Sequence, residues 1–395
     1  MKNLPSKSVC LIVTNEISAI TFYRGYLRFL RERGWDVTLV ASGTQRILDL
    51  AEDEGVNGRL LPMEREPAPL RDIRSLWSAV RLLRAVSPSV LVFATPKASL
   101  IGAIAGRLTG VPVRVYQLWG LRLETTRGLW RRVFTVLEKI TTGCSTHIVA
   151  NSRSLADEAV ALGVAKHVTT LGEGSSHGVD VERYAPARIA EFRLPPALSE
   201  QLGRVPVVGY IGRVHRDKGV DVLLDALEVV RSRGHVLALL IVGPDEDAPL
   251  ARRIRDYSED GLVIVSAGGV DDVRPYLNRM DLLCLPTYRE GFPNVVLEAA
   301  AASRATITTT ATGARDSVID GETGLLVAPG DALGLADAIE QLLNDEDQRR
   351  RLGENARRRA EQHFRQVDVF DRQEAFLNEQ FLQIRPTRRS RIGRQ

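Results

Sequence analysis

The sequence predicts an α/β protein with two domains, each built around a parallel β-sheet. A chain of 395 residues is longer than one ordinary hydrophobic core accommodates. In both halves, short apolar runs that read as buried strands alternate with helical patterns, and this alternation is typical of parallel sheets. A segment rich in proline and alanine over 185–204 separates the two series and is expected to be a linker. We therefore predict an N-terminal domain over 1–184 and a C-terminal domain over 185–365.

The first half opens with a strand–helix–strand unit. Strands are expected over 9–13 and 37–40, a loop over 15–20, and a helix over 22–30 that ends at Gly34. The alternation then continues up to the linker. Further strands are expected over 90–93, 113–116 and 146–152, and further helices over 71–84, 99–108 and 128–139.

The second half contains two loops that follow buried strands. The first leaves the apolar run that starts at Val207 and contains Gly212 and Gly219, which let the backbone approach a ligand closely. Arg213 and Lys218 lie between them, where they could bind a diphosphate. The alternative for each cation is a solvated position in a surface loop.

The second loop follows the apolar run 281–286 and leads into a helix that begins near Pro293 or Asn294. Free amides at a helix start and the helix dipole favour an anion there. Glu290 in the loop and Glu298 one turn into the helix could accept hydrogen bonds from sugar hydroxyls. Alternatively, Glu298 only caps the helix and Glu290 is solvated. Both loops should leave the carboxyl edge of one parallel sheet, where ligands bind.

Three blocks in this half resemble the retaining glycosyltransferases of family 4. They are Gly212-Arg213 followed by Lys218-Gly219, the segment 290–298 with a glutamate at each end, and the glycine-containing segment 320–331. The resemblance covers most of the chain and is strongest over about 205–331. It implies the glycosyltransferase-B architecture, in which two Rossmann-like domains face each other across a cleft.

The resemblance also implies an activity and the residues that perform it. The reaction would move a hexose or N-acetylhexosamine from a nucleotide-diphosphate sugar, with a UDP-sugar favoured, and would retain the anomeric configuration without a metal or other cofactor. Glu290, Arg213 and Lys218 would act in catalysis, and Glu298 would bind the ribose. The remaining donor contacts would come from Gly212, Gly291, Phe292, Pro293, Asn294 and Val295.

The first half departs from the family pattern at two places. Many relatives carry His-Gly after the strand over 113–116, but this chain has Trp119-Gly120, so no catalytic histidine is carried over. Trp119 either stacks on a sugar or fills the core. The first loop also lacks the usual pair of glycines. Asn15, Arg24 and Trp119 are candidates for acceptor contacts, with a solvated helix position as the alternative for Arg24.

The last part of the chain carries three further expectations. Ser303 and Ala305 replace the glycine and proline that the family shows before a late strand, so that loop could differ locally. Asp271-Asp272 reads as a helix N-cap rather than a metal site, because no histidine or third carboxylate accompanies it. A helix over about 366–384 should cross back onto the first domain, and 385–395 form a basic tail.

The charge distribution indicates where an acceptor could bind. The net charge is +4, but residues 1–184 hold 24 Lys and Arg against 17 Asp and Glu, whereas the remainder holds 29 against 32. A helix over 128–139 either lies on anionic lipid or buries an ordinary apolar inner face. Its apolar residues are Leu129, Trp130, Val133 and Phe134, flanked by Arg127, Arg131 and Arg132.

These features lead us to expect a polyprenyl-diphosphate-linked saccharide as acceptor at an anionic membrane surface, with a soluble acceptor as the alternative. The chain is expected to be cytoplasmic or peripheral on the inner face of the membrane. It has no apolar run of about 18 residues, no signal-peptide pattern and only three scattered cysteines.

Other functions compete with this expectation. Nucleic acid is not an expected partner. An epimerase of the same architecture and a non-catalytic nucleotide-sugar-binding protein remain alternatives. A nicotinamide oxidoreductase is disfavoured, because no G-x-G-x-x-G follows the first strand.

Overall fold

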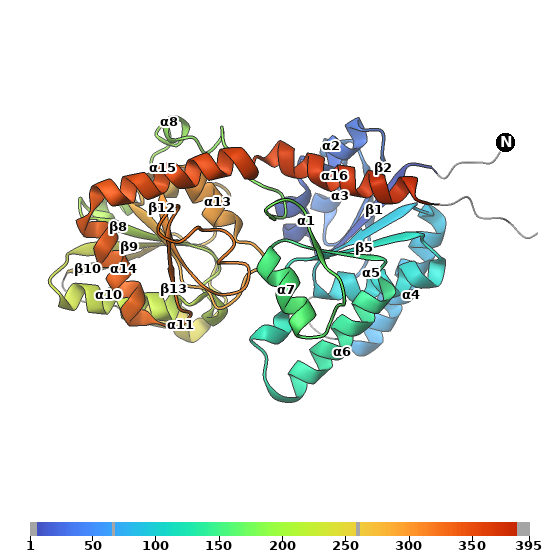
Figure 1. The fold of residues 1–395 in the computed structure, drawn as a ribbon, viewed down its shortest axis with the longest axis horizontal. Helices are drawn as coiled ribbons and strands as arrows, with labels where there is room; N and C mark the ends of the chain where they lie inside the picture. The colour runs from blue at the N-terminus through green and yellow to red at the C-terminus, as the bar shows by residue number, and fades with distance from the viewer. Residues whose placement is uncertain (1–5, 65–67, 258–260, 385–395) are drawn as a thin grey trace, which may run out of the picture.

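The structure is a computed structural model that describes residues 6–64, 68–257 and 261–384. The predicted basic tail over 385–395 lies outside these residues. Two α/β domains lie side by side (Figure 1). Helix α15 (Glu346–His363) runs along the C-terminal domain, and helix α16 (Gln366–Leu382) continues along the N-terminal domain. Each domain contains a parallel sheet, as the alternation of strands and helices predicted.

The N-terminal sheet has seven strands in the order β3-β2-β1-β4-β5-β6-β7. Side chains of β1 alternate between its two faces, with Ile12 in one core cluster and Leu11 and Val13 in another. Helices therefore cover both faces, which explains why this strand is apolar throughout. The strands are β1 Ser8–Asn15, β2 Asp36–Ser42, β3 Asn57–Leu60, β4 Val90–Phe93, β5 Val113–Leu118, β6 His147–Ala150 and β7 Thr169–Thr170. The helices are α1 Glu16–Tyr23, α2 Tyr26–Glu32, α3 Gln45–Glu54, α4 Pro69–Val86, α5 Pro96–Thr109, α6 Gly128–Cys144 and α7 Arg153–Ala161, with a 3₁₀ turn η1 at Arg122–Glu124.

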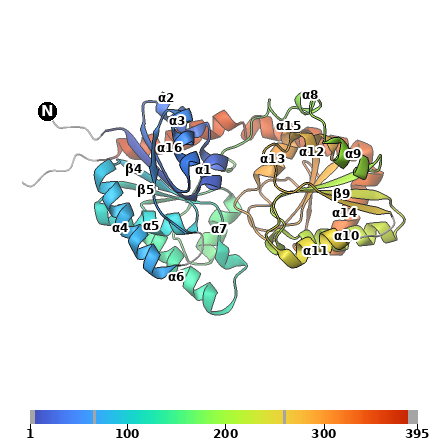
Figure 2. The same cartoon turned by 180° about the vertical axis from the view of Figure 1, so that it is seen from behind.

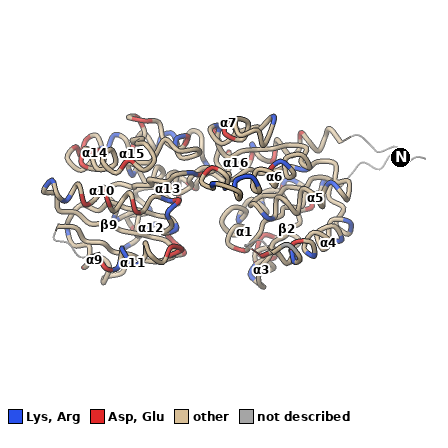
Figure 3. The backbone as a smooth tube through the Cα atoms, turned by 90° about the horizontal axis from the view of Figure 1, so that it is seen from below, with Lys and Arg blue, Asp and Glu red and all other residues tan. Residues whose placement is uncertain are grey.

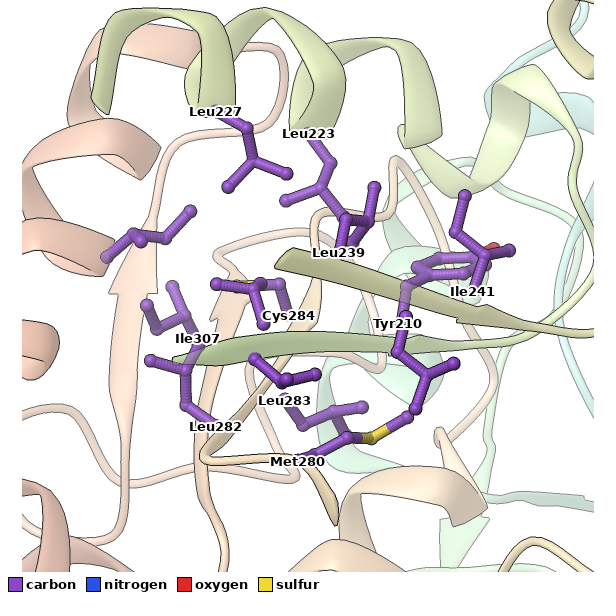
Figure 4. Close-up of a cluster of buried hydrophobic side chains, with 14 of the residues drawn as sticks. Tyr210, Leu223, Leu227, Leu239, Ile241, Met280, Leu282, Leu283, Cys284 and Ile307 are labelled. Carbon is purple, nitrogen blue, oxygen red and sulfur yellow. The ribbon is translucent and has the colours of Figure 1, made fainter. Parts of the chain in front are cut away.

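The C-terminal sheet has six strands in the order β10-β9-β8-β11-β12-β13. Its core joins Leu223 and Leu227 of α10 to Leu239 and Ile241 of β9, and all four are fully buried (Figure 4). The strands are β8 Val207–Ile211, β9 Leu237–Val242, β10 Leu262–Ser266, β11 Leu282–Leu285, β12 Ala305–Thr309 and β13 Leu325–Val327. The helices are α8 Pro186–Ile189, α9 Pro196–Leu202, α10 Val220–Ser232, α11 Ala248–Asp256, α12 Arg274–Arg279, α13 Asn294–Ala301 and α14 Ala332–Asn344, with a 3₁₀ turn η2 at Arg216–Lys218.

The start of the first helix differs from the sequence prediction. The prediction of a loop over 15–20 is wrong, because α1 begins at Glu16. The side chain of Asn15 caps this helix by accepting a hydrogen bond from the Ser18 amide at 2.9 Å. The single helix expected over 22–30 is also wrong. Gly25 adopts a φ of 79° and divides the segment into α1 and α2.

The segment that was predicted to be a linker is folded. Residues 185–204 include the short helices α8 and α9. Ile189, Leu194 and Leu202 are buried, and the last two belong to the core cluster of the C-terminal domain. Burial of these side chains fixes the segment against the C-terminal domain.

The last helix returns to the first domain, as predicted. Phe370 of α16 packs against Tyr26 of α2 with ring centroids 5.0 Å apart, and Leu377 is buried in the same N-terminal cluster. Glu374 accepts a hydrogen bond from the Trp35 indole at 2.9 Å. These contacts tie the C-terminal end of the described chain to the N-terminal domain.

Two local predictions from the late part of the chain can be compared with the structure. Ser303 adopts a φ of 55°, so a serine occupies the left-handed conformation that favours the glycine of the family pattern. Asp272 precedes α12, and its carboxylate accepts hydrogen bonds from the amide and guanidinium of Arg274, which lower the pKa of this carboxyl. The expected N-cap is wrong by one residue, because Val273 is the N-cap of α12, although Asp272 binds the first amide of the helix.

Candidate active site

The two predicted ligand loops lie at the centre of the C-terminal sheet. Strands β8 and β11 are neighbours there, and the strand order reverses direction between them. Both strands are parallel, so the loops over 212–219 and 286–293 leave the same edge. Ligands of open α/β sheets bind outside the carboxyl ends of the strands at such a point.

Lys218 and Glu290 meet across these two loops. Lys218 ends the 3₁₀ turn η2, and its ammonium group lies 2.5 Å from a carboxylate oxygen of Glu290. Both side chains are largely buried, with 17% and 13% of their surface exposed. A charged pair with so little solvent contact is held in place by its surroundings, and it presents one donor and one acceptor at the sheet edge.

Further hydrogen bonds fix the loop around this pair. The backbone oxygen of Asp217 accepts bonds from the Tyr288 amide at 3.0 Å and the Thr287 hydroxyl at 3.1 Å. The Asp217 carboxylate binds the Arg289 guanidinium at 2.8 Å. The residue before Lys218 is therefore joined at three points to the segment that carries Glu290.

Arg213 lies beside this pair but is bound elsewhere. Its guanidinium forms an ion pair with Glu246, from the loop after β9, and is 40% exposed. Tyr210 lies near both predicted catalytic charges: burial raises the pKa of its hydroxyl, Glu290 raises it further and Arg213 lowers it. Arg213 and Glu290 therefore both lie near Tyr210, but among the described residues no hydrogen bond or ion pair joins them.

Helix α13 presents free amides to the same region. It begins at Asn294 after Pro293, and no side chain caps its first turn. The Asn294 side-chain oxygen accepts a hydrogen bond from the Ser176 hydroxyl at 3.3 Å, so a loop of the N-terminal half reaches the helix start. An uncapped helix N-terminus of this kind is suited to a phosphate group.

Glu298 lies one turn further along α13 and has different partners from Glu290. It is hydrogen-bonded to the hydroxyl of Tyr184, and its environment includes Arg183 and Asp272. Burial raises the pKa of the Glu298 carboxyl to about 7, although Tyr184 and Arg183 act in the opposite direction. The carboxyl therefore titrates near neutral pH.

The predicted acceptor residues occupy different environments. The ring of Trp119 packs against Phe22 with centroids 4.1 Å apart and against Tyr23 at 5.8 Å, which agrees with the core-filling alternative for this residue. The side-chain oxygen of Asn15 caps α1. Arg24 is exposed at the end of α1, in agreement with its alternative as a solvated position.

The two domains touch directly at Trp119, Gly120 and Gly291. A Cβ atom added to Gly291 would overlap the backbone carbonyl of Trp119, so only glycine allows this approach. A Cβ on Gly120 would lie 3.7 Å from the Gly291 nitrogen. Trp119 and Gly120, which stand where many relatives have His-Gly, therefore contact the Glu290 loop through backbone atoms.

Sequence reasoning missed a second set of contacts at this junction. Ser154, at the start of α7, binds the Asp316 carboxylate, and its hydroxyl accepts a hydrogen bond from the Gly313 amide at 2.7 Å. Arg289 donates to the Thr125 hydroxyl at 2.9 Å. These partners are more than 150 residues apart in the chain, and no local motif marks them.

Over 6–64, 68–257 and 261–384, no three His, Cys, Asp or Glu side chains are grouped closely enough to hold an ion.

Comparison with known families assigns both halves of the chain. Residues 205–345 match the family described as "Glycosyl transferases group 1", and residues 20–174 match the family described as "Glycosyl transferase 4-like domain". The chain is 34% identical to the capsular polysaccharide biosynthesis glycosyltransferase CapM of Staphylococcus aureus over 91% of this chain and 94% of the relative. It is 33% identical to the lipopolysaccharide core biosynthesis glycosyltransferase LpsE of Rhizobium meliloti (strain 1021) over 52% of this chain and 56% of that relative.

Solved structures show the same arrangement of domains. Anabaena Alr3699/HepE in complex with UDP and glucose has a TM-score of 0.75 with 20% identity, covering 94% of this chain and 99% of that one. Sucrose-phosphate synthase from Thermosynechococcus elongatus has a TM-score of 0.73 with 19% identity, covering 95% and 99%. The chain therefore belongs to the group 1 glycosyltransferases and has the glycosyltransferase-B fold.

Proposed function

We propose that this glycosyltransferase moves a hexosyl or N-acetylhexosaminyl residue from a UDP-sugar to a lipid-linked saccharide during synthesis of a cell-surface polysaccharide, with retention of the anomeric configuration. The observation that carries this proposal is the Lys218–Glu290 pair beside the uncapped start of α13. The names of CapM and LpsE support the polysaccharide context, and the UDP and UDP-glucose complexes of Alr3699/HepE support the donor class.

The reaction requires negative charge on the departing diphosphate to be stabilised. In this proposal the ammonium of Lys218 and the backbone amides of Phe292, Asn294 and Val295 bind that charge. Arg213 joins them by exchanging Glu246 for a phosphate oxygen. Preorganised donors of this kind lower the barrier because they need no rearrangement as charge develops. Glu290 accepts a hydrogen bond from a hydroxyl of the donor sugar and keeps Lys218 in position.

The direct test combines donor binding with product analysis. The thermal midpoint of the protein should rise with UDP-sugars more than with GDP- or ADP-sugars at equal concentration. Proton NMR of the transferred sugar should show the anomeric configuration of the donor. An epimerase would instead isomerise the donor sugar, and a non-catalytic binding protein would show the thermal shift but release no UDP with any acceptor.

The pH dependence of UDP binding tests the role of Glu298. Ribose hydroxyls donate to the ionised carboxylate, whereas burial holds the free-enzyme pKa at about 7. A group with a raised pKa is protonated below that value, so binding must displace a proton at low pH. Affinity for UDP should therefore increase by about tenfold between pH 6 and pH 8 and change little above that range.

Glu298→Gln provides the matched control for this titration. UDP itself titrates in the same range, but it does so equally with both proteins. The variant should bind UDP more weakly, and the ratio of variant to wild-type dissociation constants should grow as pH rises. Calorimetry at four pH values measures this ratio, and a constant ratio would assign the ribose contact to another residue.

The surface of the N-terminal domain supports a membrane-bound acceptor. Helix α6 exposes Leu129 (74%), Trp130 (59%) and Val136 (55%) rather than burying them, and α4 exposes Leu70 and Trp77. Arginines accompany both stretches, and their positions are blue in Figure 3. Exposed apolar residues beside arginines favour an anionic lipid surface over the ordinary inner face. Among the helices of residues 6–64, 68–257 and 261–384, none combines the length and the apolar character that a membrane span requires.

Vesicle flotation tests this surface. The protein should float with vesicles containing anionic phospholipid at low salt, and replacing Leu129 and Trp130 together by serine should lower the partition coefficient by about tenfold or more. Leu333→Ser is the control, because Leu333 is 61% exposed on α14 of the other domain. A wild-type protein that does not float would point to an acceptor in the aqueous phase.

A further inference from the structure

A cavity between helices α4, α5 and α6 is separate from the donor site. It has a volume of about 130 Å³. Its walls are mainly apolar and come from Leu100 and Ile101 of α5 and from Phe134 and Leu137 of α6. The three helices lie together on one side of the N-terminal domain (Figure 2). Among them, α4 exposes Leu70 and Trp77, and α6 exposes Leu129 and Trp130.

Two cations are among the residues that line this cavity. Lys97 lies in the first turn of α5, and Arg122 lies in η1 with its guanidinium 5.6 Å from the centre of the Phe134 ring. Arg122 forms no ion pair with an acidic residue in the described part of the chain. An anion beside Arg122 would therefore meet a guanidinium whose charge is not already matched by a carboxylate.

Two acidic residues also line the cavity, and both have partners. The Asp72 carboxylate is 2.7 Å from the Lys97 ammonium and also accepts a hydrogen bond from the Ala68 amide at 3.0 Å. Glu138 accepts a hydrogen bond from the Tyr116 hydroxyl at 3.0 Å, and burial raises the pKa of its carboxyl to about 7. The negative charge at the cavity is thus partly compensated within the protein.

The order of strands and helices shows how the cavity lies relative to the junction between the domains. Pro96 and Lys97 follow strand β4, and Arg122 follows β5, so the cations lie beyond the carboxyl edge of the N-terminal sheet. The same edge carries Trp119 and Gly120, which touch the Glu290 loop. The apolar walls extend from there along α5 and α6. A ligand in the cavity would have its charged end toward the catalytic residues.

We propose that this cavity binds the first isoprenyl unit of a polyprenyl-diphosphate-linked acceptor, with the diphosphate at Arg122, beside the Lys97–Asp72 pair. The inference rests on the proposed function, because it specifies the lipid end of that acceptor. An apolar cavity of about 150 Å³ can hold a benzene molecule, so a five-carbon isoprenyl unit matches this volume. Chain carbons beyond it would continue over the apolar residues that α4 and α6 expose.

Calorimetry with farnesyl diphosphate in detergent-free buffer tests this site without requiring sugar transfer. The protein should bind farnesyl diphosphate at least about tenfold more tightly than inorganic diphosphate or farnesol, because only the intact molecule engages both ends of the cavity. Ile101→Trp and, separately, Leu100→Trp fill the space and should each weaken binding by about tenfold or more. Arg122→Gln should weaken it, whereas Arg188→Gln, at a 67% exposed position on α8 of the other domain, should not.

The outcomes separate this inference from the proposed function. The thermal shift with UDP should be unchanged in the filled variants, which also shows that they are folded. Farnesyl diphosphate that binds no better than inorganic diphosphate, or equally well to both filled variants, would overturn the cavity assignment while UDP binding and sugar transfer could persist. A protein that binds farnesyl diphosphate as described but does not bind UDP would contradict the proposed function alone.

Discussion

Replacing Lys218 with alanine is expected to lower kcat for sugar transfer by about 10- to 100-fold or more while the protein remains folded. Each charge-assisted hydrogen bond to the departing diphosphate contributes on the order of 1.5–3 kcal/mol, and each 1.36 kcal/mol corresponds to about tenfold in rate. Lys218 is held at the site by Glu290 at 2.5 Å, so it need not be recruited as charge develops. Initial rates of UDP release with saturating donor measure the effect.

The same substitution leaves Glu290 with little solvent and without its cation. The free energy of unfolding should therefore fall by about 1–3 kcal/mol. Adding Glu290→Gln to Lys218→Ala should restore most of this stability, because the buried negative charge is removed, but it should not restore activity. This double variant separates a catalytic role from a structural one.

Arg216→Ala is the matched control for Lys218. Arg216 lies in the same 3₁₀ turn, but its side chain is 69% exposed and pairs with Asp247 at 3.3 Å. Exposed ion pairs contribute little to stability, so this variant should retain nearly all activity. Equal losses in the two variants would show that the turn, rather than the Lys218 ammonium, is what transfer requires.

Much of the fold could be predicted because strong local patterns define its elements. The strand predicted over 90–93 has the same bounds in the structure, Val90–Phe93. Four consecutive apolar residues between polar segments favour a short buried strand over a helix. The start of α1 was missed for the opposite reason. Helix α1 (Glu16–Tyr23) is apolar on most sides, so its apolar residues do not recur with the 3.6-residue period of a helix. In addition, Asn15, which caps the helix, was assigned to a loop.

The candidate site could be predicted only in part, because its final geometry depends on contacts between distant segments. The resemblance placed Lys218 and Glu290 together although 72 residues separate them, and the structure agrees. It gave no indication that Arg213 would pair with Glu246 or that Glu298 would bind Tyr184. Such partners follow from how the loops meet in space, and a single sequence does not encode them as a motif.

The interdomain contact of Gly291 leads to the second large expected effect. Gly291→Ala should lower kcat/KM by about 100-fold or more, because the added methyl group would overlap the Trp119 carbonyl and hold the two domains apart. A displacement of about 1 Å between reacting groups can cost about 100-fold in rate. Gly291 does not have a positive φ, so alanine fits its backbone conformation and the C-terminal domain should fold normally.

Separate measurements distinguish domain closure from donor binding in Gly291→Ala. The Lys218–Glu290 pair and the start of α13 belong to one domain, so the dissociation constant for UDP should change by less than about threefold. Small-angle scattering with UDP bound should give a larger radius of gyration than for wild type. Gly143→Ala is the control, since its added methyl group would meet no atom within 4 Å. If Gly291→Ala keeps wild-type kcat/KM, the contact between Trp119 and Gly291 is not part of the reacting conformation, and acceptor and donor must meet with the domains further apart.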